Sequence, residues 1–213
     1  MEQLTIRRET AADYRAVEEL TRRAFWNLYV PGCTEHYVAH ILRGHPDFIP
    51  ELDLVLELDG NLIGNVMYTR AKLVDADGAE KTVLTFGPVC IDPAYQRQGY
   101  GRRLLEYSFA QAVRLGYDTI VIFGSPANYV GCGFQSCKKF NVCLEGGIFP
   151  AAMMVKELTS GALDGRTWVY RQSPAMEFDA AQAEEFDKTF TPMEKGWQPS
   201  QEEFYIQSNA TLG

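Results

Sequence analysis

The residues with the clearest chemical potential form a short loop between an expected strand and an expected helix. Gly99 and Gly101 let the backbone turn its N–H groups to one side, because glycine tolerates conformations closed to other residues. The positive end of the helix that follows adds to those donors, so the loop can hold a phosphate or pyrophosphate. Positive side chains cluster there as well, at Arg97, Arg102 and Arg103. The segment therefore predicts an anion-binding loop.

Two common nucleotide-binding motifs are excluded at this loop. A P-loop needs the pattern GxxxxGK followed by Ser or Thr, and the chain contains no such string. The dinucleotide fingerprint needs a third glycine, where this chain has Leu104. The anion expected on the loop thus belongs to another class of ligand.

The elements that position this loop follow from hydrophobic periodicity and turn signals. Alternation of apolar and polar residues predicts strands, and apolar residues three and four positions apart predict helices. One expected helix runs through Val17 to Leu28. The other expected helices span 34–42 and 102–115, with a short one inside 125–134, and the expected strands span 4–7, 52–58, 62–74, 81–91, 119–123, 140–144 and 153–158. The resulting order is β-α-α-β-β-β-α-β-α-β-β, a mixed α/β (α+β) fold.

The fourth strand carries an interruption at Gly87-Pro88. Proline lacks the N–H that a ladder needs, so a bulge is expected there. We expect the fourth strand to splay from the fifth beyond that point and to leave backbone groups of Val89, Cys90 and Ile91 unpaired. Free backbone groups of this kind can bind an extended ligand.

The loop resembles the Q/R-x-x-G-x-G signature of the GNAT superfamily of acyl-CoA-dependent N-acyltransferases, matched by Gln96, Gly99 and Gly101. A second match is similar to the family's Y-x-x-x-G-F motif, with Tyr129, Gly133 and Phe134. The order of elements over residues 1–158 agrees with the family as well. The resemblance implies a mostly antiparallel central sheet, with helices on both faces and a split between the fourth and fifth strands.

The resemblance implies acetyl-CoA as co-substrate and an amine as acceptor, which attacks the thioester directly in a ternary complex. Tyr129 is then the acid toward the departing thiolate, since a phenol with a pKa near ~10 can donate to a thiol near ~8.5. An N–H at Val89 or Cys90 would polarise the thioester oxygen. The residues implied to bind the co-substrate are Val89, Cys90, Ile91, Gln96, Arg97, Gln98, Gly99, Tyr100, Gly101, Arg102 and Ser125.

The chain departs from the commonest form of the family just before the tyrosine, where the sequence is Ser125-Pro-Ala-Asn-Tyr129. A short variant of this kind occurs in some bacterial-type members. The fourth strand also offers no carboxylate as general base. Four other acids could act through a water, and none is favoured: Glu51, Asp53, Glu57 and Glu145.

Two alternatives to acetyl transfer stay open: transfer of an acyl group other than acetyl, and a protein that binds acyl-CoA without catalysis. A non-catalytic acyl-CoA sensor would keep the loop and lose turnover, and the missing carboxylate on the fourth strand is its support. The aromatic residues around the first two helices are core residues by default, although in the family that region forms one wall of the acceptor pocket. They are Phe25, Trp26, Tyr29, Tyr37 and Phe48.

Composition excludes several other classes of protein. Twenty Lys and Arg residues against 28 Asp and Glu residues disfavour a nucleic-acid partner. No apolar run approaches the roughly 18 residues of a membrane span, and the first residues are charged rather than leader-like, so a cytoplasmic protein without membrane contact is expected. Five cysteines are expected to be reduced thiols. No metal site is expected, because neither the cysteines nor His36, His40 and His45 match a ligand pattern.

The sequence becomes predominantly acidic after the last expected core strand. We expect residues 1–158 to form the GNAT-like domain and residues 159–213 an acidic C-terminal extension that packs on the core or on a partner subunit. The extension holds a strand candidate at 167–170 and a helix candidate at 179–190. Its length is sufficient for a homodimer contact. The acceptor is expected to be a small-molecule or peptide amine.

Overall fold

A single nine-stranded sheet organises the computed structural model, which describes residues 3–213. Its main path runs β1-β2-β3-β4-β5-β8-β6, and β9 joins β3 and β7. All pairs are antiparallel except β4 with β5 and β7 with β9. The strands are β1 Leu4–Arg8, β2 Leu54–Leu58, β3 Asn61–Val74, β4 Glu80–Ile91, β5 Thr119–Phe123, β6 Gln135–Ser136, β7 Val142–Cys143, β8 Met153–Glu157 and β9 Trp168–Arg171.

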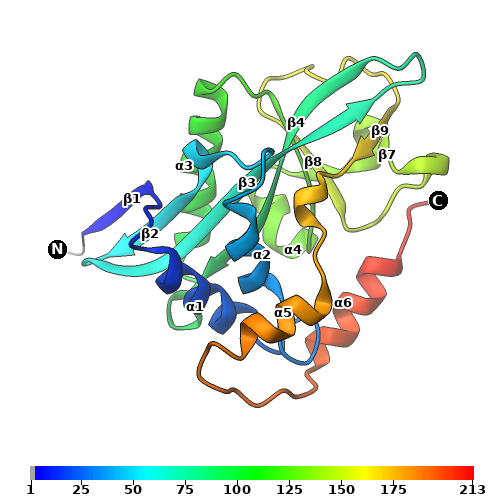
Figure 1. The fold of residues 1–213 in the computed structure, drawn as a ribbon. Helices are drawn as coiled ribbons and strands as arrows, with labels where there is room; N and C mark the ends of the chain where they lie inside the picture. Colours follow the sequence, from blue (N-terminus) through cyan, green and yellow to red (C-terminus); the bar gives the residue numbers. More distant parts are fainter. Residues whose placement is uncertain (1–2) are drawn as a thin grey trace.

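Helices cover both faces of the sheet, with α1 and α2 on one face and α3 on the other (Figure 1). Side chains alternate across a strand, so neighbouring residues of β3 enter different cores. Tyr68 is buried with the α3 residues, whereas Met67 is buried with α2. The helices are α1 Tyr14–Phe25, α2 Glu35–Leu42, α3 Tyr100–Arg114, α4 Pro126–Tyr129, α5 Ala180–Asp187 and α6 Pro199–Asn209.

The sheet splits between β4 and β5, as expected from the Gly87-Pro88 interruption. These two parallel strands are in register only at Leu84 and Ile120. The pairing of β4 with β3 shifts register between Val66 and Tyr68, opposite the interruption, and resumes at Val89. The last residues of β4 thus keep one partner strand and have an open edge toward β5.

One expected strand is much shorter than the sequence pattern indicated. Of residues 140–144, only β7 is extended, because a 3₁₀ turn at Cys137–Phe140 takes the preceding residues. The Ser136 hydroxyl caps that turn by accepting from the Lys138 N–H at 3.3 Å. β8 lies between β5 and β6, and β7 pairs instead with β9.

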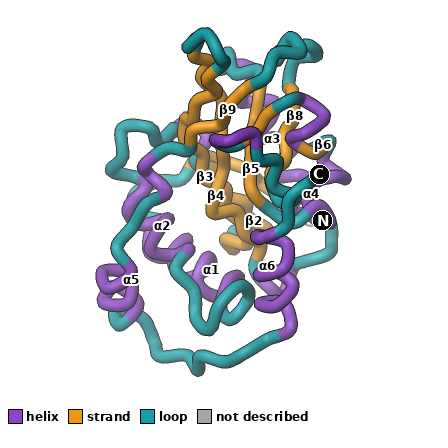
Figure 2. The backbone as a smooth tube through the Cα atoms, turned by 90° about the vertical axis from the view of Figure 1, so that its right-hand side faces the viewer, coloured by secondary structure: helices purple, strands orange, loops and turns teal. Residues whose placement is uncertain are grey.

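The segment after residue 158 packs back on the same chain. β9 extends the sheet, α5 lies beside α2, and a long loop leads to α6 on the side of α4 (Figure 2). Asp187 at the end of α5 accepts from the Arg22 guanidinium of α1 at 2.7 Å. The expected helix at 179–190 corresponds to α5, whereas α6 was not expected.

No helix within residues 3–213 is both long and apolar enough to cross a membrane.

Candidate active site

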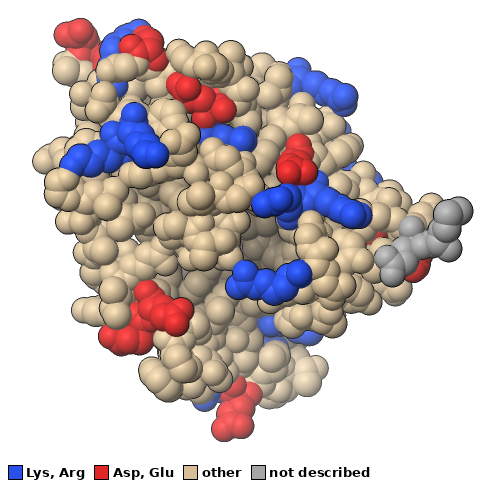
Figure 3. Space-filling view, turned by 180° about the vertical axis from the view of Figure 1, so that it is seen from behind, with Lys and Arg blue, Asp and Glu red and all other residues tan. Residues whose placement is uncertain are grey.

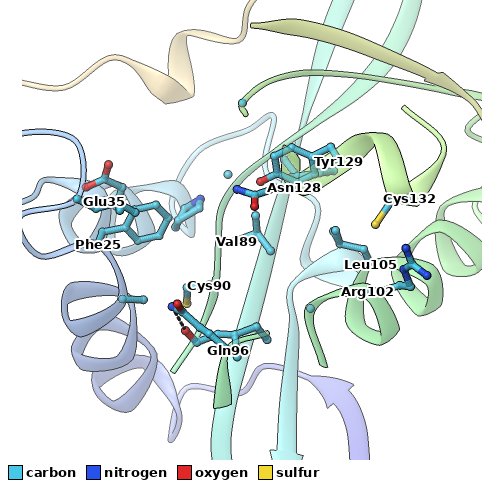
Figure 4. A pocket seen from close by; sticks show the side chains of 18 of the residues that line it. Phe25, Glu35, Val89, Cys90, Gln96, Arg102, Leu105, Asn128, Tyr129 and Cys132 are labelled. Carbon is cyan, nitrogen blue, oxygen red and sulfur yellow. Dashed lines mark hydrogen bonds between the residues drawn. The ribbon is translucent and has the colours of Figure 1, made fainter. Parts of the chain in front are cut away.

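A cleft of about 620 Å³ opens where β4 leaves β5. Three parts of the chain supply most of its lining: the α1–α2 segment, the end of β4 with the loop into α3 and the start of that helix, and the end of β5 with α4 and the turn after it. Met176 completes the lining beside α2. Figure 4 shows Phe25 and Glu35 on one side of Val89, and Arg102 and Leu105 on the other. The split in the sheet thus creates the cleft.

The loop into α3 has the backbone form that an anion site needs. Gly99 has φ +87°, and Arg97 has φ +62°. The first intrahelical bond of α3 runs from the Arg103 N–H to the Gly99 carbonyl at 3.2 Å. The N–H groups of Tyr100, Gly101 and Arg102 consequently have no acceptor within the helix, and its positive end adds to them. This is an arrangement that binds phosphate groups.

Positive side chains accompany these donors. Basic side chains flank a hollow in the surface on the face seen in Figure 3. Arg97 and Arg102 both line the cleft. The Arg102 guanidinium also donates to the Gly131 carbonyl at 3.0 Å, which ties α3 to the turn that follows α4.

Tyr129 lies at the end of α4, with its ring against the open part of the sheet. Its ring centroid is 5.6 Å from that of Phe86 and 5.9 Å from that of Phe134. Burial, with smaller contributions from Tyr29 and Cys132, raises the pKa of the phenol above its ordinary value. The hydroxyl has no hydrogen-bond partner among the described residues. A protonated phenol is therefore free to donate into the cleft.

The end of β4 presents backbone donors to the cleft at alternate positions. Backbone N–H groups point to alternate sides along a strand. The Asp92 N–H donates to the Ile63 carbonyl of β3 at 2.8 Å, so the Cys90 N–H, two residues earlier, also faces β3. The N–H groups of Val89 and Ile91 therefore point toward the open edge. The Cys90 side chain packs toward α1, 3.6 Å from the Thr21 hydroxyl, and burial raises the pKa of its thiol to about 11.

Most of the residues named from the sequence meet in this cleft. The lining includes Tyr129, Val89, Cys90, Ile91, Gln96, Arg97, Gly99, Gly101 and Arg102. The side chains of three others do not line it. Tyr100 packs its ring into the core, Gln98 bonds the Ala94 carbonyl at 3.1 Å, and Ser125 precedes α4 without lining the cleft.

None of the four acids considered from the sequence lines the cleft. Glu57 and Glu145 pair with arginines, Asp53 is buried beside Asn65, and Glu51 is exposed on a 3₁₀ turn. Among residues 3–213, the carboxylate that does line the cleft is that of Glu35, the first residue of α2. The sequence offered a weak signal for it, since an acid at the start of a helix is ordinarily explained by the helix dipole.

The histidines are engaged elsewhere. His36 is buried with its Nε2 3.1 Å from the Asp187 carboxylate, and His40 lies 2.9 Å from Glu18. Among residues 3–213, no three His, Cys, Asp or Glu side chains gather as a metal ion would require.

A split sheet with an anion-binding loop at the start of a helix, and a phenol opposite, defines the class of acyl-CoA-dependent acyltransferases. The model of the acetyltransferase (GNAT) family matches residues 16–134, more than half of the chain. The protein belongs to this family and is an acyltransferase.

Curated relatives and solved structures agree with the family. The Escherichia coli K12 N-acetyltransferase YhbS is 28% identical over 165 residues, which cover 77% of this chain and 93% of the relative. The crystal structure of E. coli YhbS in complex with CoA matches with a TM-score of 0.71 and 26% identity, over 84% of this chain and 95% of that one. A Brucella melitensis GNAT acetyltransferase, solved with acetyl-CoA, shares the fold at a TM-score of 0.63 and 22% identity, over 82% of this chain and 99% of that one.

Proposed function

We propose that the protein transfers the acetyl group of acetyl-CoA to an amine by direct attack in a ternary complex. The observation that carries the proposal is the open edge of β4, which runs from the anion-binding loop to Tyr129 within one cleft. The complex of the relative YhbS with CoA supports the same ligand here.

The pyrophosphate is assigned to the free N–H groups at the start of α3, aided by Arg97 and Arg102. The pantetheine arm is assigned to the open edge of β4, where backbone donors and acceptors can bind it as an added strand. The N–H of Val89 faces the cleft and is the group we assign to the thioester oxygen. A donor of this kind typically lowers the barrier by ~2.7–4 kcal/mol.

The loop assignment is tested by titrating the protein with acetyl-CoA and with desulfo-CoA. Gly101→Asp places a carboxylate beside the expected pyrophosphate, and Gly101→Ala is its matched control. The Cβ atom that both variants add is accommodated, because it would lie 3.5 Å from Ile91 Cγ1, an ordinary contact. Gly99 is unsuitable, since its φ of +87° disfavours any side chain. We expect the aspartate variant to lose binding by about tenfold or more and the alanine variant to keep it. Equal affinities would contradict the assignment.

Tyr129 is assigned as the acid toward the CoA thiolate. Tyr129→Phe removes the hydroxyl and keeps the ring packing, so turnover should fall by about 10²-fold or more while acetyl-CoA affinity is retained. Thiol release measures turnover, and calorimetry measures affinity. A non-catalytic acyl-CoA sensor is the alternative, and it predicts binding without thiol release in the presence of any amine.

The other expectations stay predictions. A cytoplasmic location is tested by fractionating cells, and a homodimer by sedimentation of the purified protein. The domain boundary near residue 158 is tested by truncation there, although β9 and α5 lie beyond it and contact β3 and α2. Acetyl specificity is tested by comparing acyl-CoA thioesters of increasing length.

A further inference from the structure

The charged side chains that line the cleft are unevenly placed. Among the described residues they are Arg97, Arg102 and Glu35. Both arginines belong to the anion-binding loop, whereas Glu35 lies across the end of β4, beside Phe25 (Figure 4). The cleft thus has a positive end and an end with a single negative charge.

Glu35 is the shielded acid that lines the cleft, and no cation within residues 3–213 lies beside it. Asp53 also lacks an ion pair in that range, but it lies outside the cleft beside Asn65. Glu9 and Glu18 both pair with Arg43, and Asp187 pairs with Arg22. Glu35 forms no ion pair within residues 3–213, and its carboxylate accepts from the Thr34 N–H at 3.0 Å. Burial raises the pKa of Glu35 in spite of that backbone donor. A shielded carboxylate without a counter-ion is costly unless a ligand supplies one.

The surroundings of Glu35 are apolar. Side chains of Phe25, Leu28, Tyr29, Val38 and Met176 line the same end of the cleft. Aromatic faces attract a cation and also cover an apolar body. This end therefore suits a ligand that joins an ammonium group to a hydrocarbon or aromatic group.

The C-terminal helix limits the size of that ligand. α6 is attached to both rims of the cleft: the Ser200 hydroxyl donates to the Leu28 carbonyl at 2.8 Å, and the Gln207 amide donates to the Gly124 carbonyl at 3.3 Å. Phe204 also stacks on Tyr29 with ring centroids 4.5 Å apart. A helix that joins the rims leaves no open groove for a folded protein, so a small molecule is favoured.

We propose that Glu35 binds the ammonium group of the acceptor and takes a proton from it, and that the acceptor is a small primary amine on an apolar body. This inference rests on the proposed acetyl transfer and adds the residue and the class of acceptor.

Each turnover removes two protons from the acceptor nitrogen and exchanges a C–S bond for a C–N bond. The acceptor ammonium gives one N–H proton to the Glu35 carboxylate, and the freed nitrogen lone pair forms the C–N bond with the thioester carbon. The C–S bond breaks, and the sulfur receives the proton of the Tyr129 hydroxyl. The nitrogen loses its second proton to the Tyr129 oxygen through solvent. Glu35 then releases its proton to water, so each turnover yields an amide, CoA thiol and one proton.

The test compares Glu35→Gln with Glu106→Gln. The two substitutions remove the same charge, but Glu106 is exposed on α3 and does not line the cleft. Probes are 2-phenylethylamine, its uncharged analogue 2-phenylethanol, and phenylalanine, whose carboxylate would lie near Glu35. The CoA-saturated wild type should bind 2-phenylethylamine at least tenfold more tightly than either other probe. Glu35→Gln should weaken that binding by about 10- to 100-fold, and kcat/KM for acetyl transfer by about 10²-fold or more.

Binding of acetyl-CoA by Glu35→Gln shows that the variant folds and separates the two proposals. If the wild type binds acetyl-CoA and Glu35→Gln acetylates 2-phenylethylamine as fast as Glu106→Gln, the role of Glu35 is wrong while acetyl transfer stands. A CoA-saturated wild type that prefers phenylalanine, or binds none of the probes, overturns the class of acceptor. A wild type that does not bind acetyl-CoA overturns the proposed function itself.

Discussion

The position of the Tyr129 ring depends on the absence of a side chain at Gly124. A Cβ built at Gly124 would lie 2.5 Å from Cε2 of Tyr129 and 3.1 Å from Cδ2. Carbon atoms in contact need about 3.5 Å, so Gly124→Ala must move the ring by about 1 Å. A displacement of about 1 Å at a reacting group can cost about 10²-fold in rate, equivalent to about 2.7 kcal/mol of barrier.

We therefore expect Gly124→Ala to lower kcat by about 10²-fold while acetyl-CoA affinity changes by less than about threefold. The N–H groups assigned to the pyrophosphate belong to the start of α3, and the added methyl group contacts the Tyr129 ring instead. Thiol release measures the rate, and calorimetry measures the affinity. Gly44→Ala is the matched control, because its Cβ would meet only the Ile41 carbonyl at 3.8 Å and Gly44 does not line the cleft.

A double-mutant cycle makes the reasoning refutable even if Gly124→Ala also lowers stability. If Gly124 acts by placing the Tyr129 hydroxyl, adding Gly124→Ala to Tyr129→Phe should cost little further rate, because the group it misplaces is already missing. Fully additive effects, or a Gly124→Ala enzyme with wild-type kcat, would refute the link between this glycine and the phenol.

Two predictions concern stability. Asp187→Asn leaves the Arg22 guanidinium, which is 5% exposed, without its carboxylate. The free energy of unfolding, measured in urea, should therefore fall by about 3 kcal/mol. A fall of less than about 1 kcal/mol would show that the pair does not hold the C-terminal segment. Burial, together with the adjacent Glu9, raises the pKa of Asp53 to about 9, far above the unfolded value of about 3.9. The folded state then binds more protons between these values, so Asp53 lowers stability as pH rises through that window. Asp53→Asn should therefore lose less stability than the wild type between pH 5 and pH 8 in urea titrations, and identical pH dependences would contradict the assignment.

The anion-binding loop and the order of elements could be predicted because they depend on residues adjacent in the chain. Gly99 is required where φ is positive, and the helix pattern that follows fixes where free N–H groups lie. Gly87-Pro88 interrupts a ladder wherever it occurs in a strand, which is why the split beside β5 was expected. The spacing from Tyr129 to Phe134 is likewise a local pattern, and it pointed to Tyr129 as the candidate acid.

Other features depended on which segments meet in space. Tyr100 lies between two cleft residues in sequence, yet it is buried in the core, because successive residues of a helix point in different directions. The strand expected at 140–144 was shortened by a turn whose cap the apolar pattern did not reveal.

The sequence by itself determined the family and predicted the anion-binding loop and the Tyr129 phenol, because each depends on a short, local pattern. Only the tertiary structure placed Glu35 in the cleft and α6 across its rims, since nothing near either segment in the chain encodes the other side of the cleft. The Glu35 carboxylate is notable only because no cation among the described residues lies beside it. That absence is a property of the packed molecule and not of any stretch of sequence.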